Sequence, residues 1–203
     1  MNFSSFREKV VYQPLLLGAF ALLASGALAW MSKATGDAIV AAEAADLRTS
    51  LGEVLPAGFA DNDLLGDTLT IERDGWPVTI YRARQHGKVR GAVFKVAERG
   101  YAADIQLLMA LDADGTTLGV RVVKHAETPG LGDKIEATKS PWIEDFAGKS
   151  LRKPLPEQWA VRKDGGAFDQ FAGATITPRA VVKAVKGGLA FFSEHRQEIL
   201  GEE

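Results

Sequence analysis

Residues 105–124 read IQLLMALDADGTTLGVRVVK, two apolar runs joined by a short polar stretch. Asp112, Asp114 and Gly115 are residue types that favour turns, and the flanking Ile, Leu and Val favour strands. The segment therefore predicts an antiparallel hairpin with strands at 105–111 and 118–124. A calcium loop is the alternative for DADG, but it needs further acidic ligands and the chain continues TTLGVRVV.

Three more strand-like runs precede this hairpin, at residues 69–73, 78–84 and 89–96. Asp74-Gly75 and His86-Gly87 lie between them and indicate turns. Residues 141–156 carry two prolines near aromatic residues and are predicted to be irregular. The tryptophans are interpreted as core or interface residues: Trp76, Trp142 and Trp159.

A helix is predicted after the last irregular stretch. Thr177 is a good N-cap, and Pro178 suits the first helical position. Apolar residues then recur at helical spacing: Val181, Val182, Val185, Leu189 and Phe192. The helix is expected to run from Pro178 to about Glu198. Strands followed by a terminal helix predict an α+β domain with an antiparallel sheet.

The N-terminal part of the chain contains an uncharged stretch of 23 residues, 10–32, VVYQPLLLGAFALLASGALAWMS. About 20 apolar residues are enough to cross the hydrocarbon core of a membrane, so this stretch predicts a transmembrane helix. A cleaved signal peptide is the alternative, because Ala27-Leu28-Ala29 matches a cleavage pattern.

The charges beside this stretch predict its orientation. Arg7 and Lys9 precede it, whereas Asp37, Glu43 and Asp46 follow it. By the positive-inside bias, residues 1–9 form a cytoplasmic tail and the main domain lies in the periplasm. We expect the transmembrane helix at 10–32 and, within 33–66, a juxtamembrane helix at 34–50 followed by a loop at 51–66, which Pro56 and Gly58 interrupt. The main domain is expected at 67–203.

Composition narrows the possible functions. The chain has 24 basic and 26 acidic residues, so it lacks the positive charge that nucleic-acid binding requires. It has no cysteine, which excludes disulfides, thiolate metal sites and thiol nucleophiles. No motif for a metal, a hydrolytic triad or a dinucleotide is visible. Redox chemistry would therefore require an organic cofactor.

Two segments carry the features of a binding site. In DQFAGATITP (169–178), Gly173 and Ala174 leave the backbone open, and Thr175 precedes a predicted helix N-terminus, which favours an anion such as phosphate. In HAETPGLGDK (125–134), two glycines bracket Leu131 directly after a strand. Such a loop can pack its backbone against a flat ligand. From the pattern alone, tight turns with capping hydroxyls remain the alternative for both segments.

Taken together, the N-terminal span, ETPGLG at 127–132 and DxxxGAT at 169–175 resemble the FMN-binding domain family. Within that family, the chain resembles the G subunits of Rnf-type ion-translocating electron-transport complexes. The motifs occur in the family's order and extend over nearly the whole chain. The resemblance implies a small extracytoplasmic FMN-binding domain behind one N-terminal transmembrane helix.

The resemblance also implies roles for individual residues. Thr175 would be the residue to which a flavin transferase attaches FMN covalently through its phosphate, and Asp169 would belong to the sequence that the transferase reads. The remaining residues of the implied cofactor site lie in the two motifs: Gly173, Ala174, Thr177, Glu127, Thr128, Leu131, Gly132 and Lys134. No catalytic residue is expected beyond the flavin, and no metal ligand.

The function implied is that of an electron-carrier subunit in a membrane-bound ferredoxin:NAD oxidoreductase complex that translocates ions. Its partners would be the other subunits of the inner-membrane complex and, during maturation, the flavin transferase. Two alternatives stay open. One is the C subunit of the sodium-translocating NADH:quinone reductase, whose members are usually longer, and the other is an anchored periplasmic scaffold without a cofactor.

Overall fold

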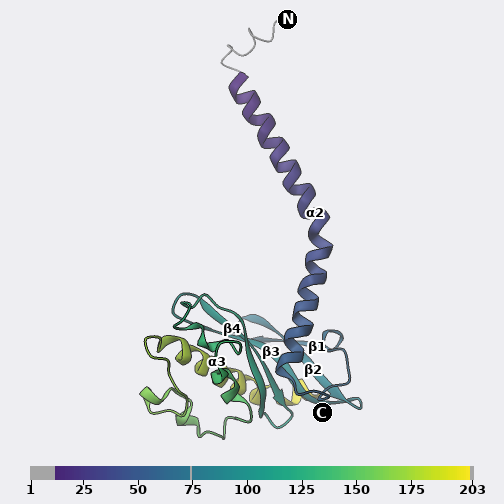
Figure 1. Cartoon of the computed structure of the whole chain (residues 1–203). Helices are drawn as coiled ribbons and strands as arrows, with labels where there is room; N and C mark the ends of the chain where they lie inside the picture. Colours follow the sequence, from purple (N-terminus) through teal and green to yellow (C-terminus); the bar gives the residue numbers. More distant parts are fainter. Residues whose placement is uncertain (1–11, 74, 202–203) are drawn as a thin grey trace, which may run out of the picture. The chain divides into compact units, whose positions relative to one another are not determined.

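A computed structural model describes residues 12–73 and 75–201 of the chain (Figure 1). The predicted tail at 1–9, the first two residues of the predicted span and Asp74 of a predicted turn lie outside the described residues. The chain divides into two compact units, and the boundary between them falls between Asp46 and Leu47.

The first unit consists of most of α2, a helix of 43 residues from Tyr12 to Val54. Its most apolar window has a mean hydropathy of 1.8 and no buried side chains. Leu22 and Trp30, for example, are 77% and 73% exposed. A long helix with apolar side chains outward on all sides is suited to hydrocarbon surroundings, so by length and composition α2 is able to cross a membrane.

The structure differs from the sequence prediction along this helix. The predicted span and the predicted juxtamembrane helix at 34–50 are one continuous helix, because the Ala-rich sequence between them contains no proline. The prediction that residues 51–54 are loop was wrong. Leu51 and Val54 are helical and buried in the second unit, and the helix ends just before Pro56, which disfavours helical geometry in the residue preceding it.

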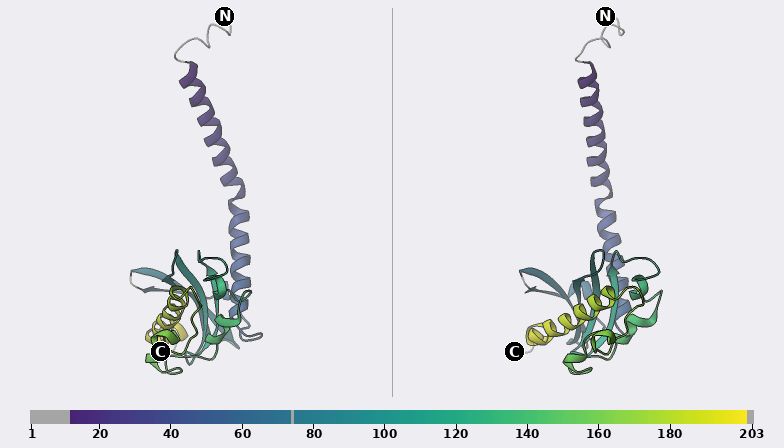
Figure 2. Two further views of the ribbon diagram at one scale, coloured as in Figure 1. Left: turned by 60° about the vertical axis from the view of Figure 1, so that its left-hand side comes forward. Right: turned by 90° about the vertical axis from the view of Figure 1, so that its left-hand side faces the viewer.

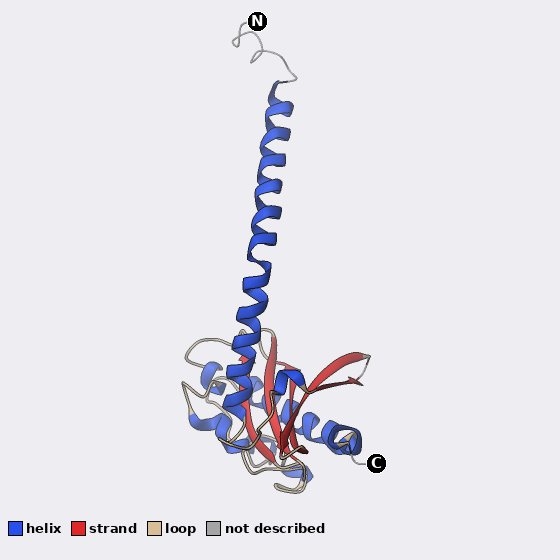
Figure 3. Cartoon of the chain, turned by 90° about the vertical axis from the view of Figure 1, so that its right-hand side faces the viewer, coloured by secondary structure: helices blue, strands red, loops and turns tan. Residues whose placement is uncertain are grey.

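The second unit is built on one antiparallel sheet of five strands in sequential order (Figure 3). The strands are β1 (Thr68–Arg73), β2 (Trp76–Gln85), β3 (Lys88–Arg99), β4 (Asp104–Asp112) and β5 (Thr117–Lys124). All five predicted strands are confirmed, each within three residues at either end. The DADG segment is a hairpin turn, since Asp112 Oδ1 accepts hydrogen bonds from the backbone N–H groups of Asp114 and Thr116 at 2.9 and 2.8 Å.

Both faces of the sheet are covered. In β4, Leu107, Met109 and Leu111 belong to one core cluster, whereas Leu108 and Ala110 belong to the other. This alternation follows the two-residue period of a strand and explains why β4 is apolar nearly throughout. The larger cluster packs under α3, and the smaller one contains Leu51 at the end of α2.

The terminal helix α3 extends from Ile176 to Glu194 and crosses one face of the sheet (Figure 2). It begins two residues earlier than predicted, so the assignment of Thr177 as N-cap was wrong. The N-cap is Thr175, and the Thr177 hydroxyl is used in a tertiary hydrogen bond instead. The helix also stops earlier, at His195, and a short helix α4 (Arg196–Leu200) follows.

Residues 125–175 connect β5 to α3 and contain four short 3-10 helices: η2 (Asp133–Ile135), η3 (Pro141–Phe146), η4 (Pro156–Gln158) and η5 (Arg162–Asp164). Buried aromatic rings hold this connection together, including Trp142 and Trp159 as predicted. Trp76 was predicted to be a core or interface residue. It is not a core residue, because its side chain is 76% exposed on β2. That it lies in an interface stays a prediction.

Candidate functional site

The loop after β5 makes a tight turn. The carbonyl of Thr128 accepts hydrogen bonds from the backbone N–H groups of Leu131 at 3.1 Å and Gly132 at 3.0 Å. Gly130 has a φ of +78°, and Pro129 precedes it, which is the residue pattern of a type II turn. Thr-Pro-Gly-Leu is therefore a local signal for this turn, and Leu131 is its fourth residue.

The segment that leads into α3 contains a second turn of this kind. The Phe171 carbonyl accepts a hydrogen bond from Ala174 N–H at 3.2 Å, with Gly173 at a φ of +80°. Buried aromatic contacts fix the turn, because the rings of Phe171 and Trp142 pack edge-to-face at 5.1 Å. The Trp142 indole also donates a hydrogen bond to the Asp169 carbonyl at 2.9 Å. Thr175 is thereby held at the start of α3.

Glu127 joins these two turns. Its carboxylate accepts a short hydrogen bond from the Thr177 hydroxyl in the first turn of α3. It also accepts hydrogen bonds from the backbone N–H groups of Tyr101 at 3.0 Å and Ala102 at 3.4 Å. Glu127 is only 5% exposed. A buried carboxylate is stabilised by such donors, so Glu127 holds three segments that are distant in sequence.

Two glycines permit this close packing. A Cβ at Gly132 would lie 2.9 Å from Thr177 Oγ1 and 3.0 Å from Glu127 Cβ, and a Cβ at Gly100 would lie 2.5 Å from Glu127 Oε1. No side chain fits in either place without displacing the carboxylate or its donors. The second glycine of the predicted PGLG motif is therefore needed for the approach of the loop to α3.

A cavity of about 550 Å³ opens where these segments meet. Eight of the ten predicted site residues line it: Glu127, Thr128, Leu131, Gly132, Gly173, Ala174, Thr175 and Thr177. Asp169 and Lys134 do not line it; Asp169 is exposed and pairs with Arg162 at 3.0 Å.

Three lining residues were not predicted from the sequence: Tyr101, Lys163 and Ile176. Ile176 directly follows Thr175, so its place next to the DxxxGAT motif could have predicted that it lines the cavity. Tyr101 and Lys163 reach the cavity only through tertiary structure, from the β3–β4 connection and from η5. Tyr101, Leu131 and Ile176 are also exposed large apolar side chains, at 67%, 44% and 47%. They make the cavity an apolar depression at the surface.

The opposite part of the lining favours an anion. Thr175 is the N-cap of α3, but its side chain makes no capping hydrogen bond. The first-turn N–H groups of Ile176 and Thr177 have no intrahelical acceptor, and the first turn contains no acidic residue. Lys163 adds a positive charge to the lining. A helix N-terminus with a lysine beside it suits a phosphate group.

Nearby arginines are already paired with carboxylates. Arg179 holds Asp164 through two hydrogen bonds of 2.6 Å and lowers the pKa of that carboxyl. Arg162 pairs with Asp169. Among the described residues that line the cavity, Lys163 is the one cationic side chain.

A polar network supports the loop from behind the cavity. His125 Nδ1 accepts a hydrogen bond from Glu127 N–H at 3.1 Å, so Nε2 carries the proton and donates to Glu136 at 2.9 Å. Lys139 pairs with Asp133 and Glu136, both at 2.8 Å, and lowers the pKa of each carboxyl; His125 adds to the effect on Glu136. These side chains fix the loop without lining the cavity.

No group of three or more His, Asp or Glu side chains suited to a metal occurs within residues 12–73 and 75–201.

Comparison with known proteins identifies the class of this site. The profile of the FMN-binding domain matches residues 100–190, a range that contains all the lining residues. The protein is 52% identical over 187 residues to the G subunit of the ion-translocating oxidoreductase complex of Cereibacter sphaeroides, covering 92% of this chain and 85% of the relative. It is 45% identical to the protein of the same name in Pseudomonas aeruginosa, covering 97% and 95%.

The chain therefore belongs to the family of G subunits of ion-translocating oxidoreductase complexes, proteins with an FMN-binding domain. A solved structure, NqrC of Shewanella oneidensis, aligns with a TM-score of 0.49 and 23% identity over 72% of this chain and 74% of that one.

The residues present fit an FMN molecule. A cavity of about 550 Å³ is within the usual range for cofactor sites. Its apolar side chains suit a flat ring system, and the N-terminus of α3 with Lys163 suits a phosphate. Both ends of the cofactor thus find matching chemistry in one cavity.

Proposed function

We propose that this protein is an electron-carrier subunit of a membrane-bound, Rnf-type ferredoxin:NAD oxidoreductase complex that translocates ions, and that it carries FMN linked covalently to Thr175. The observation that carries the proposal is the position of Thr175. Its side chain makes no capping bond and lines the cavity at the N-terminus of α3.

The protein's residues divide the work of holding the cofactor. FMN supplies the redox chemistry, because its ring accepts and releases electrons. Lys163 and the first-turn N–H groups of α3 bind the phosphate, because the charge of the lysine and the partial positive charge of the helix N-terminus balance the negative charge of the phosphate. Tyr101, Leu131 and Ile176 contact the ring and shield part of it from water. Glu127 fixes the loop and the helix start relative to each other.

Attachment requires a bond between Thr175 Oγ1 and the phosphorus of FMN. On an activated FMN donor bound by a flavin transferase, the bond between Thr175 Oγ1 and phosphorus forms as the bond between phosphorus and the donor's leaving group breaks. The leaving group departs with the bonding electron pair, and the hydroxyl proton of Thr175 is released to solvent. Relative to free FMN, the product has lost one water. We propose that Asp169, exposed and paired with Arg162, belongs to the surface that the transferase reads. No independent turnover of a substrate is expected from this subunit.

The test combines intact mass with in-gel fluorescence after co-expression with a flavin transferase. The native chain should gain about 438 Da, one FMN minus water, and remain fluorescent after denaturation. Thr175→Ala should gain nothing, and Thr175→Ser should retain some attachment because the hydroxyl is kept. Thr128→Ala is the matched control, since it removes another threonine hydroxyl from the same cavity and should leave the added mass unchanged.

The alternatives predict other outcomes. If neither the native chain nor Thr175→Ala gains mass while the transferase modifies a control substrate, the chain is an anchored scaffold without covalent flavin. The C subunit of the sodium-translocating NADH:quinone reductase would carry the same modification. It would be distinguished by purifying the native complex and identifying the subunits that accompany this chain.

We also propose the orientation in which the N-terminus lies in the cytoplasm and the FMN-binding domain in the periplasm of the inner membrane. Arg7 and Lys9 before the apolar stretch and the acidic residues after it support this orientation.

A further inference from the structure

Two acidic side chains lie close to Lys163 in the chain, and each of them is held by an arginine. Asp164 pairs with Arg179 of α3 at 2.6 Å, and Asp169 pairs with Arg162 at 3.0 Å. A carboxylate left unpaired beside an ammonium group would compete with any other anion for it. Because both carboxylates are paired, Lys163 remains available to the cavity that it lines.

The pair between Arg179 and Asp164 occupies both oxygens of the carboxylate. Arg179 Nε donates a hydrogen bond to Oδ2 and Nη2 donates one to Oδ1, each at 2.6 Å. Two parallel hydrogen bonds from a planar guanidinium hold a carboxylate in one orientation. The hydrogen bonds from Arg179 are the main cause that lowers the pKa of Asp164, and the charge of Lys163 adds to the effect. Asp164 is therefore a carboxylate at neutral pH, and its charge is felt by Lys163.

The backbone around Lys163 is fixed without this pair. The Arg162 N–H donates a hydrogen bond to the Phe168 carbonyl at 2.7 Å, and the side chain of Phe168 is buried in the core. The Gln170 side chain accepts a hydrogen bond from the Lys163 N–H at 3.0 Å. Removing the Arg179 side chain therefore changes the charges around Lys163 more than it changes the backbone.

The carboxylate that lines the cavity is already occupied. Glu127 is buried, and it accepts hydrogen bonds from the Thr177 hydroxyl and from two backbone N–H groups. A carboxylate with these donors is a poor competitor for Lys163. Asp164, which is adjacent to Lys163 in the chain, is therefore the carboxylate whose release would draw the ammonium group away from the cavity.

We propose that Arg179 is a positioning residue for the phosphate of FMN, because by holding both oxygens of Asp164 it leaves the Lys163 ammonium group to bind that phosphate at the N-terminus of α3. Arg179 does not line the cavity itself and acts through Asp164 and Lys163. The inference rests on the proposed function, which places FMN in this cavity. Loss of Arg179 should impair phosphate binding, and removal of the Asp164 charge should reverse that impairment.

The test compares the binding of FMN with that of riboflavin, which lacks the phosphate. Both are titrated into the full chain in detergent, produced without flavin transferase, and followed by flavin fluorescence. The native chain should bind FMN more tightly than riboflavin. Arg179→Ala should weaken FMN binding about tenfold and leave riboflavin binding unchanged, because an ionic hydrogen bond to the phosphate is lost. Arg179→Ala combined with Asp164→Asn should restore the affinity for FMN, since the competing carboxylate is gone.

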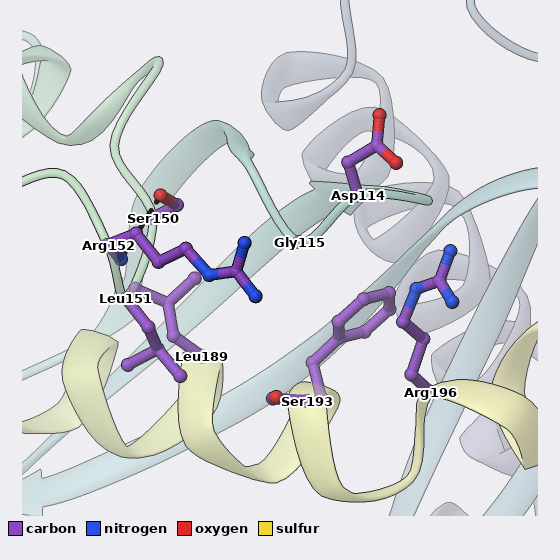
Figure 4. Close-up of a pocket in the computed structure, with 9 residues that line it drawn as sticks. Asp114, Gly115, Ser150, Leu151, Arg152, Leu189, Ser193 and Arg196 are labelled. Atoms are coloured by element: carbon purple, nitrogen blue, oxygen red, sulfur yellow. Dashed lines mark hydrogen bonds between the residues drawn. The ribbon is translucent and has the colours of Figure 1, made fainter.

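A second cavity provides the control, because arginines line it too. It has a volume of about 510 Å³, lies at the opposite end of α3 from Thr175, and includes Arg152 and Arg196 in its lining (Figure 4). Arg152→Ala removes an arginine side chain from this second cavity and should leave the preference for FMN unchanged. A loss of that preference would place the phosphate there and overturn the proposal.

Three further results would overturn it. One is equal binding of FMN and riboflavin by the native chain, including no binding of either. Another is a loss in Arg179→Ala that is as large for riboflavin as for FMN. The third is a double variant that binds FMN as weakly as Arg179→Ala, since the pair would then be a structural contact only.

Covalent attachment is measured separately, by the mass that the native chain gains with flavin transferase. A chain that gains this mass but does not prefer FMN to riboflavin disproves the role of Arg179 alone. A chain that prefers FMN and responds to Arg179→Ala as expected, but gains no mass, disproves the covalent attachment alone.

Discussion

Glu127 fixes the geometry of the proposed flavin cavity, because it connects three segments that line or support it. Its carboxylate reaches Tyr101 across 26 positions of sequence and Thr177 across 50. The sequence motif predicted a residue that lies against the cofactor. Glu127 does line the cavity, but its hydrogen bonds show that it also acts as the connection between loop and helix.

Glu127→Gln should therefore destabilise the FMN-binding domain. Gln has nearly the same shape but loses the charge, and its NH2 group must face a position where the carboxylate accepted a hydrogen bond. We expect a loss of about 1.5–3 kcal/mol in the free energy of unfolding, measured by urea titration of the full chain in detergent. The attached flavin should also become less protected from solvent, with altered fluorescence.

Glu136→Gln is the matched control, because it makes the same chemical change in the same loop at a half-exposed carboxylate. It should cost no more than about 1 kcal/mol. Equal losses for the two variants would show that burial of Glu127 is not what matters.

How much of the site could be predicted depends on whether a residue belongs to a local pattern. Gly173 and Gly130 lie in turns with positive φ, and such turns are visible in sequence. Tyr101 and Lys163 are single residues in ordinary surroundings, and only the hydrogen bonds and packing of distant segments bring them to the cavity. Thr177 was misread as a cap because a hydroxyl near a helix start fits both roles equally well.

At the scale of elements, the end of α2 shows that residues favouring a loop can lead to a wrong helix boundary. Pro56 and Gly58 favoured a loop from residue 51 onward, yet Leu47, Leu51 and Val54 follow the i, i+4, i+7 spacing of an apolar helix face. The smaller core cluster on the second face of the sheet depends on this last turn. The run of buried residues along β4 shows that this cover is needed, because both faces of the sheet are apolar there.

Leu51→Ala should accordingly cost about 2–5 kcal/mol in the free energy of unfolding, because Leu51 is 1% exposed and its removal leaves a cavity beneath the sheet. The change is measured by urea unfolding followed through tryptophan fluorescence. Leu155→Ala makes the same substitution at a side chain that is 54% exposed, and it should change stability by less than about 0.5 kcal/mol. A small effect at Leu51 would mean that the cluster is not part of the stable fold.

The start of β1 is held by an ion-pair cluster that predicts a pH dependence. Asp67 is 18% exposed and accepts hydrogen bonds from Arg82 Nε at 2.7 Å and from Arg84. Burial alone would raise its pKa, but hydrogen bonds from Arg84 and Arg82 outweigh this and hold the pKa below its ordinary value of 3.8. A lowered pKa in the folded state means that the folded protein binds the proton less readily than the unfolded chain.

The stabilisation from Asp67 is therefore complete above the ordinary pKa and is lost as the pH falls through the lowered one. The thermal midpoint of the native chain should fall as the pH drops below the ordinary carboxyl pKa of 3.8, and Asp67→Asn should lower the midpoint at pH 7 and make the midpoint less dependent on pH. Asp104→Asn, in an exposed pair with Arg99, should leave the slope as it is. An unchanged slope in Asp67→Asn would assign the acid sensitivity to other carboxylates.

At the scale of the whole molecule, the order of segments was more predictable than their boundaries. Hydropathy identifies a span and periodicity identifies strands, because both depend on runs of residues. The point at which α2 changes from one unit to the other, between Asp46 and Leu47, lies inside a continuous helix and has no breaking residue to mark it. Only contacts with the sheet define it.

The proposed orientation is testable because the chain contains no cysteine, so one engineered thiol is labelled without background. Ser5→Cys lies beside Arg7 and Lys9, and Thr70→Cys lies at an exposed position on β1. In cells with a permeabilised outer membrane, a membrane-impermeant maleimide should label Thr70→Cys at once and Ser5→Cys only after the inner membrane is disrupted. The reverse pattern would place the flavin domain in the cytoplasm. Labelling of both in intact cells would mean that the apolar helix does not span the membrane.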